Sequence, residues 1–278
     1  MYVVAIAELK GSIEDEAPSL AEDLGATAYD ARLLLAAGAP IVAKTTPDRE
    51  AALELLARLR ARGHGAVACD TSAVVSSADM VAMRRPVFGD DAVTLAGSGG
   101  EPGTRAAGVT GAEVERLPYD DVLALVPAVH RRRVDTTTQV RETQLSVGRA
   151  VASGGVMFTK SVKKDTHATS EERSGVLYVF RRSAATPWLL REHGTSWMGT
   201  GLPLAPSESE NFRAAVGELR RRATGAVYDE RLVARKVTEK MALSGAGGTT
   251  TVKTSTDAAV DLLAHVVAMW AAKGNAYR

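Results

Sequence analysis

The sequence of 278 residues has one cysteine, few aromatic residues and no long uninterrupted apolar stretch. The single cysteine, Cys69, excludes a disulfide bond within the chain. Aromatic residues make up 5% of the sequence, so we expect a core built mainly from alanine, valine and leucine. No apolar stretch reaches the about 18 residues of a membrane-spanning helix. Because the N-terminal residues MYVVAIAELK also lack the charged and apolar regions of a signal peptide, we expect a cytoplasmic protein without a transmembrane segment.

The motifs of common enzymes and metal sites are missing as well. The five histidines share no HxxxH or HExxH spacing, and one cysteine cannot form a cysteine-rich zinc site. No GxSxG motif precedes a predicted helix, and the glycine-rich residues 97–103 predict a flexible loop rather than a phosphate-binding one. These absences favour a protein that is not an enzyme, with no catalytic residue, no metal site and no cofactor. One alternative is an enzyme whose scattered site includes Glu192, His193 and Trp197.

Charge is distributed unequally along the chain although the net charge is only +1. Residues 1–126 contain 19 acidic and 11 basic side chains, and the remaining residues contain 14 acidic and 23 basic ones. Such asymmetry favours either a basic part that meets an anionic surface, or two parts that attract one another within or between chains. Solvated faces of both signs are the alternative.

The first 70 residues predict the order β-α-α-β-α-β. Residues 3–9 form a β-rich run, and the apolar spacing then becomes helical. We expect Pro18 or Ser19 to open the first helix and Thr27 to cap the second. A strand follows from residue 41, and the third helix begins at Thr46 and Pro47. Residues 65–69 close the unit as a strand.

Two runs within this region, LGATAYDARLLLAAGAP and TTPDREAALELLARLRARGHGAVACD, resemble the C-terminal domain of the bacterial ribosomal stalk protein, a fold that the Clp protease adaptor shares. The resemblance covers about a quarter of the chain. The positions that carry it are Leu24, Gly25, Ala31, Leu34, Pro40, Ala51, Leu59 and Gly63. The resemblance implies a compact docking module without an active site. The lysine-rich face of the stalk family is replaced here by Glu22 and Asp23, with Arg32 as the basic residue, which favours a basic protein partner.

The middle of the chain predicts an antiparallel sheet covered by a helix. Residues 114–126 are typical of a strand, a turn and a second strand, and residues 174–182 form a hairpin with residues 188–194. A capping box at Ser207 and Glu210 opens a helix. The strand entry at 117–122, the strand 177–180 and the Phe212 helix resemble bacterial pleckstrin-homology-like domains, which implies a bent sheet closed by a helix.

The C-terminal residues predict three further segments. Residues 232–245 are expected to form a basic helix, and residues 245–256 a flexible tether. Apolar residues then recur at helical spacing in a final helix. These residues are Val260, Leu263, Val267 and Trp270. They require a hydrophobic groove, which belongs either to this chain or to a partner or second copy.

Short basic clusters in the positive half are the candidate anion-binding residues. They are Arg131, Arg132, Arg133, Lys160, Lys163, Lys164, Arg181 and Arg182. If they converge on one face, they bind acidic lipid headgroups or nucleic acid. The alternative is that they mark strand ends and turns that face water, and a solvated loop is expected around His167.

Taken together, these patterns predict an α+β protein with three parts: a stalk-like domain over 1–72, a sheet-plus-helix domain over 78–230, and a tethered helical segment over 231–278. We expect a non-enzymatic adaptor, scaffold or assembly component whose charge-polarised surface binds a protein partner or a second copy. The alternatives are a binder of anionic lipid or nucleic acid, and an enzyme with a site in the larger domain.

Overall fold

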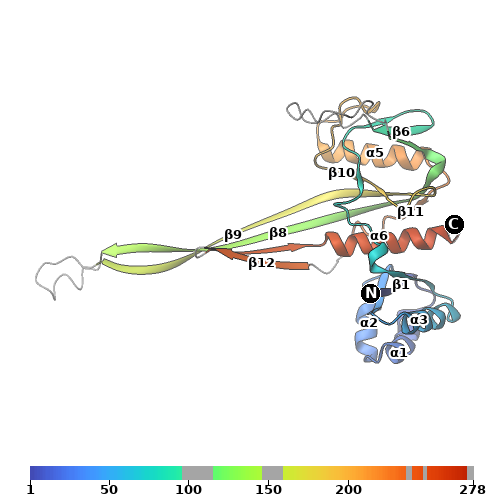
Figure 1. Cartoon of the computed structure of the whole chain (residues 1–278), viewed down its shortest axis with the longest axis horizontal. Helices are drawn as coiled ribbons and strands as arrows, with labels where there is room; N and C mark the ends of the chain where they lie inside the picture. The colour runs from blue at the N-terminus through green and yellow to red at the C-terminus, as the bar shows by residue number, and fades with distance from the viewer. Residues whose placement is uncertain (96–114, 146–158, 236–239, 247–248, 274–278) are drawn as a thin grey trace, which may run out of the picture. The chain divides into compact units, whose positions relative to one another are not determined.

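A computed structural model of the chain describes residues 1–95, 115–145, 159–235, 240–246 and 249–273 (Figure 1). The chain forms two compact units. Unit 1 comprises Met1–His130, Ser174–Val237 and Asp257–Arg278, and unit 2 comprises Arg131–Arg173 and Thr238–Thr256. Helices and largely antiparallel sheets occur together, which confirms the predicted α+β class.

The N-terminal part of unit 1 has the predicted order β-α-α-β-α-β. Its elements are β1 (Tyr2–Glu8), α1 (Ile13–Leu24), α2 (Ala28–Ala36), β2 (Ile41–Thr46), α3 (Arg49–Ala61) and β3 (Gly65–Asp70). The strands form an antiparallel sheet in the order β2-β1-β3. Because side chains alternate along a strand, Val4 and Ile6 of β1 pack against the helices α1, α2 and α3, whereas Val3 and Ala5 belong to a separate cluster on the opposite face.

Helix ends in this part are fixed by local hydrogen bonds. Thr27 caps α2 as predicted, and Gly25 ends α1 with a φ of 64°. The predicted start of α1 was wrong, because Ser12 accepts a hydrogen bond from the Asp15 amide and Pro18 lies inside the helix. The predicted start of α3 was also wrong, since the Asp48 carboxylate accepts from the amides of Glu50 and Ala51. An N-cap acceptor satisfies amides that have no partner within the helix, and this decides where each helix begins.

The larger sheet of unit 1 is covered on both faces by helices. Its strands and helices are β4 (Val81–Ala82), β8 (Val122–Leu145), β9 (Thr159–Arg181), β10 (Trp188–Arg191), β11 (Val227–Tyr228), α5 (Glu208–Arg222) and α6 (Asp257–Ala272), of which β8 and β9 continue into unit 2. The predicted hairpin of β9 with β10 is confirmed by the antiparallel pairing of Trp188 with Val179. One apolar cluster joins α5 to one side of this sheet, and a second joins α6 to the other side (Figure 1).

A second, smaller sheet completes this part of unit 1. It contains β5 (Pro86–Phe88), β6 (Ala92–Leu95) and β7 (Arg116–Pro118), paired antiparallel in that order. Two short 3₁₀ helices, Thr71–Ala73 and Tyr119–Asp121, connect neighbouring elements. The predicted strand, turn and strand before residue 126 correspond to β7, the second 3₁₀ helix and β8.

Helix α6 lies between two sheets of unit 1. Val260, Leu263 and Val267 pack against the larger sheet, and Val266 packs against Val3 on the outer face of the N-terminal sheet. The groove that these residues require therefore belongs to the same chain, and their assignment as docking residues for a partner was wrong. Trp270 is partly buried at the same contact.

Unit 2 is a sheet whose strands follow the order β12-β13-β8-β9. It contains β12 (Lys240–Ala246), β13 (Thr249–Ser255) and the unit 2 stretches of β8 and β9. The predicted basic helix and the predicted tether were both wrong in this region. Thr249–Ser255 pairs with Arg132–Thr138 of β8 through backbone hydrogen bonds. Most residues of Thr249–Ser255 are β-branched, which also favours a strand over a helix. The loop expected around His167 is part of β9.

The described side chains of unit 2 form no apolar core. Residues 131–137, 168–173 and 252–255 are all partly or fully exposed, whereas the four apolar clusters of the described residues consist of unit 1 side chains. Thr256 is the buried exception, and its hydroxyl accepts a hydrogen bond from the Arg131 amide. Within the described ranges, no helix is both long and apolar enough to cross a bilayer. The predicted domain boundaries stay predictions.

Candidate functional site

Arg181 and Arg182, the predicted anion-binding residues of unit 1, form hydrogen bonds with other residues of the chain at the end of β9. Arg181 Nε donates to the Asp121 carboxylate at 3.2 Å, and Arg182 Nη2 donates to the Gly225 carbonyl at 2.8 Å. Although burial alone would raise the pKa of Asp121, hydrogen bonds from Ser183 and Arg181 hold this pKa below its usual value. Arg181 and Arg182 therefore stabilise the end of β9, and this use competes with binding of an external anion.

The other predicted anion-binding residues lie in unit 2. Arg131, Arg132 and Arg133 are consecutive in β8, and Arg133 forms an ion pair of 2.8 Å with Asp135. The side chains of Lys160, Lys163 and Lys164 lie outside the described residues, although their backbone belongs to β9. Binding of an anionic surface by these eight residues, which requires that they converge on one face, stays a prediction.

The predicted docking residues of the N-terminal part differ in their availability. Glu22 and Arg32 are exposed. Asp23 is not available as predicted, because its side chain is 7% exposed and pairs with Arg58 at 3.1 Å and with Arg62 at 2.7 Å. Arg58 lies in α3 and Arg62 is its C-cap residue, so the Asp23 side chain joins α1 to the C-terminal end of α3. A contact between residues 39 positions apart has no signal in the local sequence pattern.

A buried polar network attaches α6 to the larger sheet. The Tyr178 hydroxyl donates to Asp261 Oδ1 at 2.6 Å and lies 2.6 Å from His130 Nε2. Because the phenol has a single proton, His130 Nε2 must donate to it. The Ser77 amide donates to Asp261 Oδ2 at 2.9 Å. Burial and the Asp261 charge raise the pKa of Tyr178, which keeps the phenol neutral and able to donate.

His265 extends this network along α6. Its Nε2 accepts from the Val75 amide at 3.2 Å, so Nδ1 carries the proton and donates to the Asp261 carbonyl at 2.7 Å. Burial lowers the pKa of His265, in agreement with a neutral ring. Tyr178, Asp261 and His130 are between 0% and 3% exposed. Reactants in solution have no access to such groups, so their role is to position α6.

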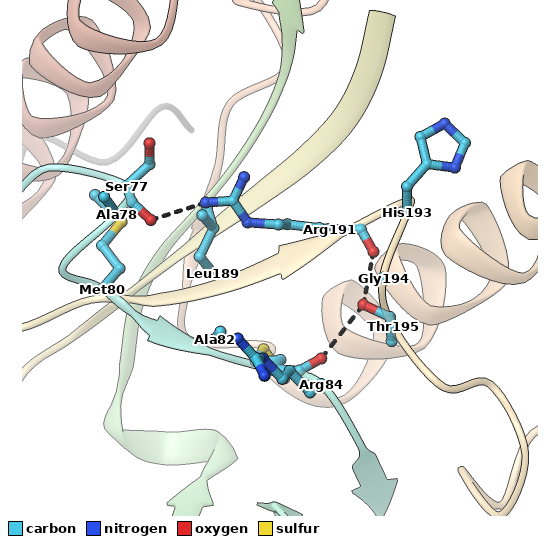
Figure 2. A pocket seen from close by; sticks show the side chains of 11 residues that line it. Ser77, Ala78, Met80, Ala82, Arg84, Leu189, Arg191, His193, Gly194 and Thr195 are labelled. Carbon is cyan, nitrogen blue, oxygen red and sulfur yellow. Dashed lines mark hydrogen bonds between the residues drawn. The ribbon is translucent and has the colours of Figure 1, made fainter. Parts of the chain in front are cut away.

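A cavity of about 380 Å³ is lined in part by Ser77, the residue whose amide donates to Asp261 (Figure 2). Its apolar lining includes the buried side chains of Met80, Met83 and Leu189. Its polar and remaining lining residues are Ser77, Ala78, Ala82, Arg84, Arg191, His193, Gly194 and Thr195. The segment after the N-terminal sheet, strand β10 and the loop that follows β10 all contribute to this cavity, and none of its lining residues is acidic.

Arg191 and Arg84 give the cavity its charge. The half-buried Arg191 donates through Nη2 to the Ser77 carbonyl at 2.8 Å, and Figure 2 shows its side chain reaching toward Ser77. Thr195 is buried and donates to the Arg191 carbonyl at 2.7 Å. His193 lies within 2.6 Å of the Glu208 carboxylate through Nδ1. The site therefore offers cationic groups beside an apolar surface, an arrangement suited to an anion with an apolar body.

Of the three residues of the alternative enzyme site, Glu192, His193 and Trp197, only His193 lines the cavity. Trp197 belongs to an apolar core cluster. The Glu192 carboxylate accepts from the Gly175 amide at 2.7 Å and from the Ser209 hydroxyl. These hydrogen bonds hold the pKa of Glu192 below its usual value, although burial alone would raise it. Arg84 and Arg191 were not predicted as site residues. They are 107 positions apart in the sequence, and both line this cavity because β4 pairs with β10.

No group of three His, Cys, Asp or Glu side chains gathers as a metal site would require among the described residues. None of the known family models matches this chain, and it has no significant similarity to a curated protein or to a solved structure. The resemblances to the ribosomal stalk domain and to pleckstrin-homology-like domains therefore stay predictions.

Proposed function

We propose that the protein is an assembly component that associates with further copies of itself through the open edge of β9 in unit 2. Strand β9 is bonded to β8 and β10, and the pairing with β10 covers Val176–Val179. Residues 159–173 of β9 are therefore at a sheet edge among the described residues. A long open edge has unpaired backbone groups that can add a strand from another chain.

The composition of unit 2 supports backbone pairing as the mode of association. Apart from the buried Thr256, its described side chains are partly or fully exposed and largely polar, so they provide no apolar face for a partner to cover. Backbone hydrogen bonds at an edge need no apolar side chains. The other edge strand, β12, has seven residues and so offers a shorter ladder. Among the described residues the edge of β9 is longer than that of β12, and it carries this proposal.

A second copy of the same edge is the partner whose charges match. A two-fold axis normal to the sheet pairs antiparallel strands and places the central residue opposite itself. Centring residues 159–173 on Thr166 uses this whole edge and places Lys160 opposite Glu172 and Asp165 opposite His167. In this register no two like charges are directly opposite, and opposite charges in such positions stabilise a strand pair.

Neighbouring registers fit less well. Centring on Asp165 places this carboxylate opposite its own copy, and centring on Ala168 places Lys163 opposite Arg173. Centring on His167 extends the pairing to Gly175, whose carbonyl already accepts from the Glu192 amide at 2.8 Å. The register about Thr166 avoids all three conflicts.

Light scattering after size exclusion tests this proposal with charge reversals. We expect the wild-type chain to dimerise at micromolar concentration, and Glu172→Lys to weaken dimerisation about tenfold because two lysines become opposite one another. Glu171→Lys makes the same charge change at the neighbouring position, which is opposite Ser161, and serves as the control. Because it also removes the 2.9 Å ion pair of Glu171 with Arg173, Glu171→Gln is measured beside it. Lys160→Glu combined with Glu172→Lys should restore dimerisation.

Two results would contradict the proposal in different ways. A wild-type chain that is monomeric at every concentration would reject self-association. A dimer that Glu171→Lys weakens and Glu172→Lys leaves unchanged would reject the register about Thr166.

A further inference from the structure

We propose that the cavity beside Ser77 is a binding site for a small organic anion, with an oxyanion head at Arg84 and Arg191 and an apolar body against Ala78, Ala82 and Met80. The cavity is formed by unit 1 residues, whereas the self-association proposed above involves unit 2. The two proposals can therefore fail independently.

Arg191 is the first observation that points to an anion. Its guanidinium has five N–H donors, and among the described residues its side chain donates one hydrogen bond, to the Ser77 carbonyl. No described carboxylate forms an ion pair with it. In this half-buried arginine the hydrogen bond to Ser77 compensates only part of the lost hydration, and a bound oxyanion supplies the rest through charge-assisted hydrogen bonds.

Arg84 adds a second cation to the same cavity. It is exposed and has no ion pair or side-chain hydrogen bond within the described part of the chain. The buried carboxylate Asp261 is not part of the lining and accepts from Ser77 and Tyr178. Two arginines without an acidic lining residue create a positive potential that favours an anion.

The apolar lining residues favour an organic anion over an inorganic one. Ala78 and Ala82 are exposed and Met80 is 6% exposed, and these three apolar side chains line the cavity, with Met83 and Leu189 buried behind them at 1% exposure. Its volume of about 380 Å³ lies near the lower end of the range for small-molecule pockets. The thioether side chain of methionine adapts its shape to apolar ligands. An apolar body of a few carbon atoms fits this surface.

Either a carboxylate or a phosphate monoester has the required chemistry, because both form paired hydrogen bonds with a guanidinium. Titration calorimetry with benzoate and phenyl phosphate distinguishes these two heads on the same ring. Benzyl alcohol keeps the ring without the charge, and inorganic phosphate keeps the charge without the ring. We expect one of the two aromatic anions to bind at least tenfold more tightly than benzyl alcohol and than inorganic phosphate.

A pair of neighbouring arginines supplies a matched control. Arg84→Ala should weaken the better aromatic anion about tenfold, since a charge-assisted hydrogen bond is lost. Arg85→Ala removes the same charge from an adjacent exposed residue outside the lining, and binding should change less than about twofold. Arg84 has no internal partner among the described residues, so the variant should fold.

The proposal is contradicted by any of three results. The first is that neither aromatic anion binds. The second is that benzyl alcohol or inorganic phosphate binds as tightly as the aromatic anions. The third is that Arg84→Ala and Arg85→Ala have equal effects, which would indicate a non-specific effect of net charge.

Discussion

At the residue scale, one buried carboxylate organises the contact of α6 with the larger sheet. Asp261 is 2% exposed and accepts from the Tyr178 hydroxyl and from the Ser77 amide. A buried carboxylate is tolerated when donors surround it, and loss of one donor costs more free energy than the bond itself contributes. The network therefore makes the position of α6 depend on a few hydrogen bonds.

The substitution Tyr178→Phe tests this dependence. It removes the hydroxyl between His130 and Asp261 and leaves the ring in place, so we expect the free energy of unfolding to fall by about 2 kcal/mol. Tyr29→Phe makes the same chemical change on a side chain that is 66% exposed, and we expect a change within about 0.5 kcal/mol. Urea unfolding followed by circular dichroism measures both. Equal stabilities of the two variants would contradict the role given to this network.

Local residue signals were predictable, whereas long-range partners were not. The caps at Thr27 and Ser207 were predicted because each hydrogen bond joins residues three positions apart. The partner of Asp23 is 39 positions away and that of Tyr178 is 83 positions away. Nothing in a local pattern identifies such a partner. Asp23 was consequently assigned to a docking surface when it stabilises the fold.

At the element scale, α6 illustrates what hydrophobic periodicity predicts and what it omits. The stripe of Val260, Leu263 and Val267 was predicted, and all three side chains are buried. The periodicity does not reveal that Val266 on another side of the helix packs against Val3, because that contact joins the two ends of the sequence. Because α6 packs against the larger sheet on one side and against the N-terminal sheet on another, it links these two sheets.

The close packing of α6 on β3 gives a prediction at this scale. A Cβ atom at Gly65 would lie 2.6 Å from Trp270 Cζ2 and 2.8 Å from the Glu8 Cβ, so Gly65→Ala should lower the free energy of unfolding by roughly 2 kcal/mol. Gly217→Ala places a methyl group in open space on the exposed side of α5 and should raise stability by roughly 0.5–1 kcal/mol. Thermal denaturation of the two variants checks the opposite signs. Destabilisation by both variants would contradict this account.

Strand assignment failed where pairing rather than local pattern decides the structure. Residues 240–255 contain glycines, threonines and lysines, which suggested a basic helix and a tether. Their strands β12 and β13 form because each has a neighbour in the sheet, and β13 pairs with a part of β8 more than 100 positions away. Sheet pairing over such separations is invisible to a window of ten residues. The hairpin of β9 with β10 was predictable because its strands are adjacent in sequence.

At the scale of the whole molecule, apolar burial and charge are divided between the two units. The apolar clusters of the described residues belong to unit 1. Unit 2 contains 11 basic and 6 acidic residues in its sequence ranges, so part of the positive excess of the C-terminal half is concentrated there. This excess opposes the association of two copies at low ionic strength. We therefore expect dimerisation to be stronger at about 0.15 M salt, where the Debye length is about 8 Å, than in low-salt buffer.

The central claim is that two copies pair along β9 with Thr166 opposite itself, and cysteine cross-linking tests it most directly. In a Cys69→Ser chain, Thr166→Cys places two thiols at facing positions within reach of a disulfide bond. Ser161→Cys is the matched control, because its own copy would lie about 33 Å away at about 3.3 Å per residue. We predict that mild oxidation converts the Thr166→Cys chain into a covalent dimer and leaves the Ser161→Cys chain monomeric. Equal cross-linking of both chains, or none at Thr166→Cys, would contradict the account.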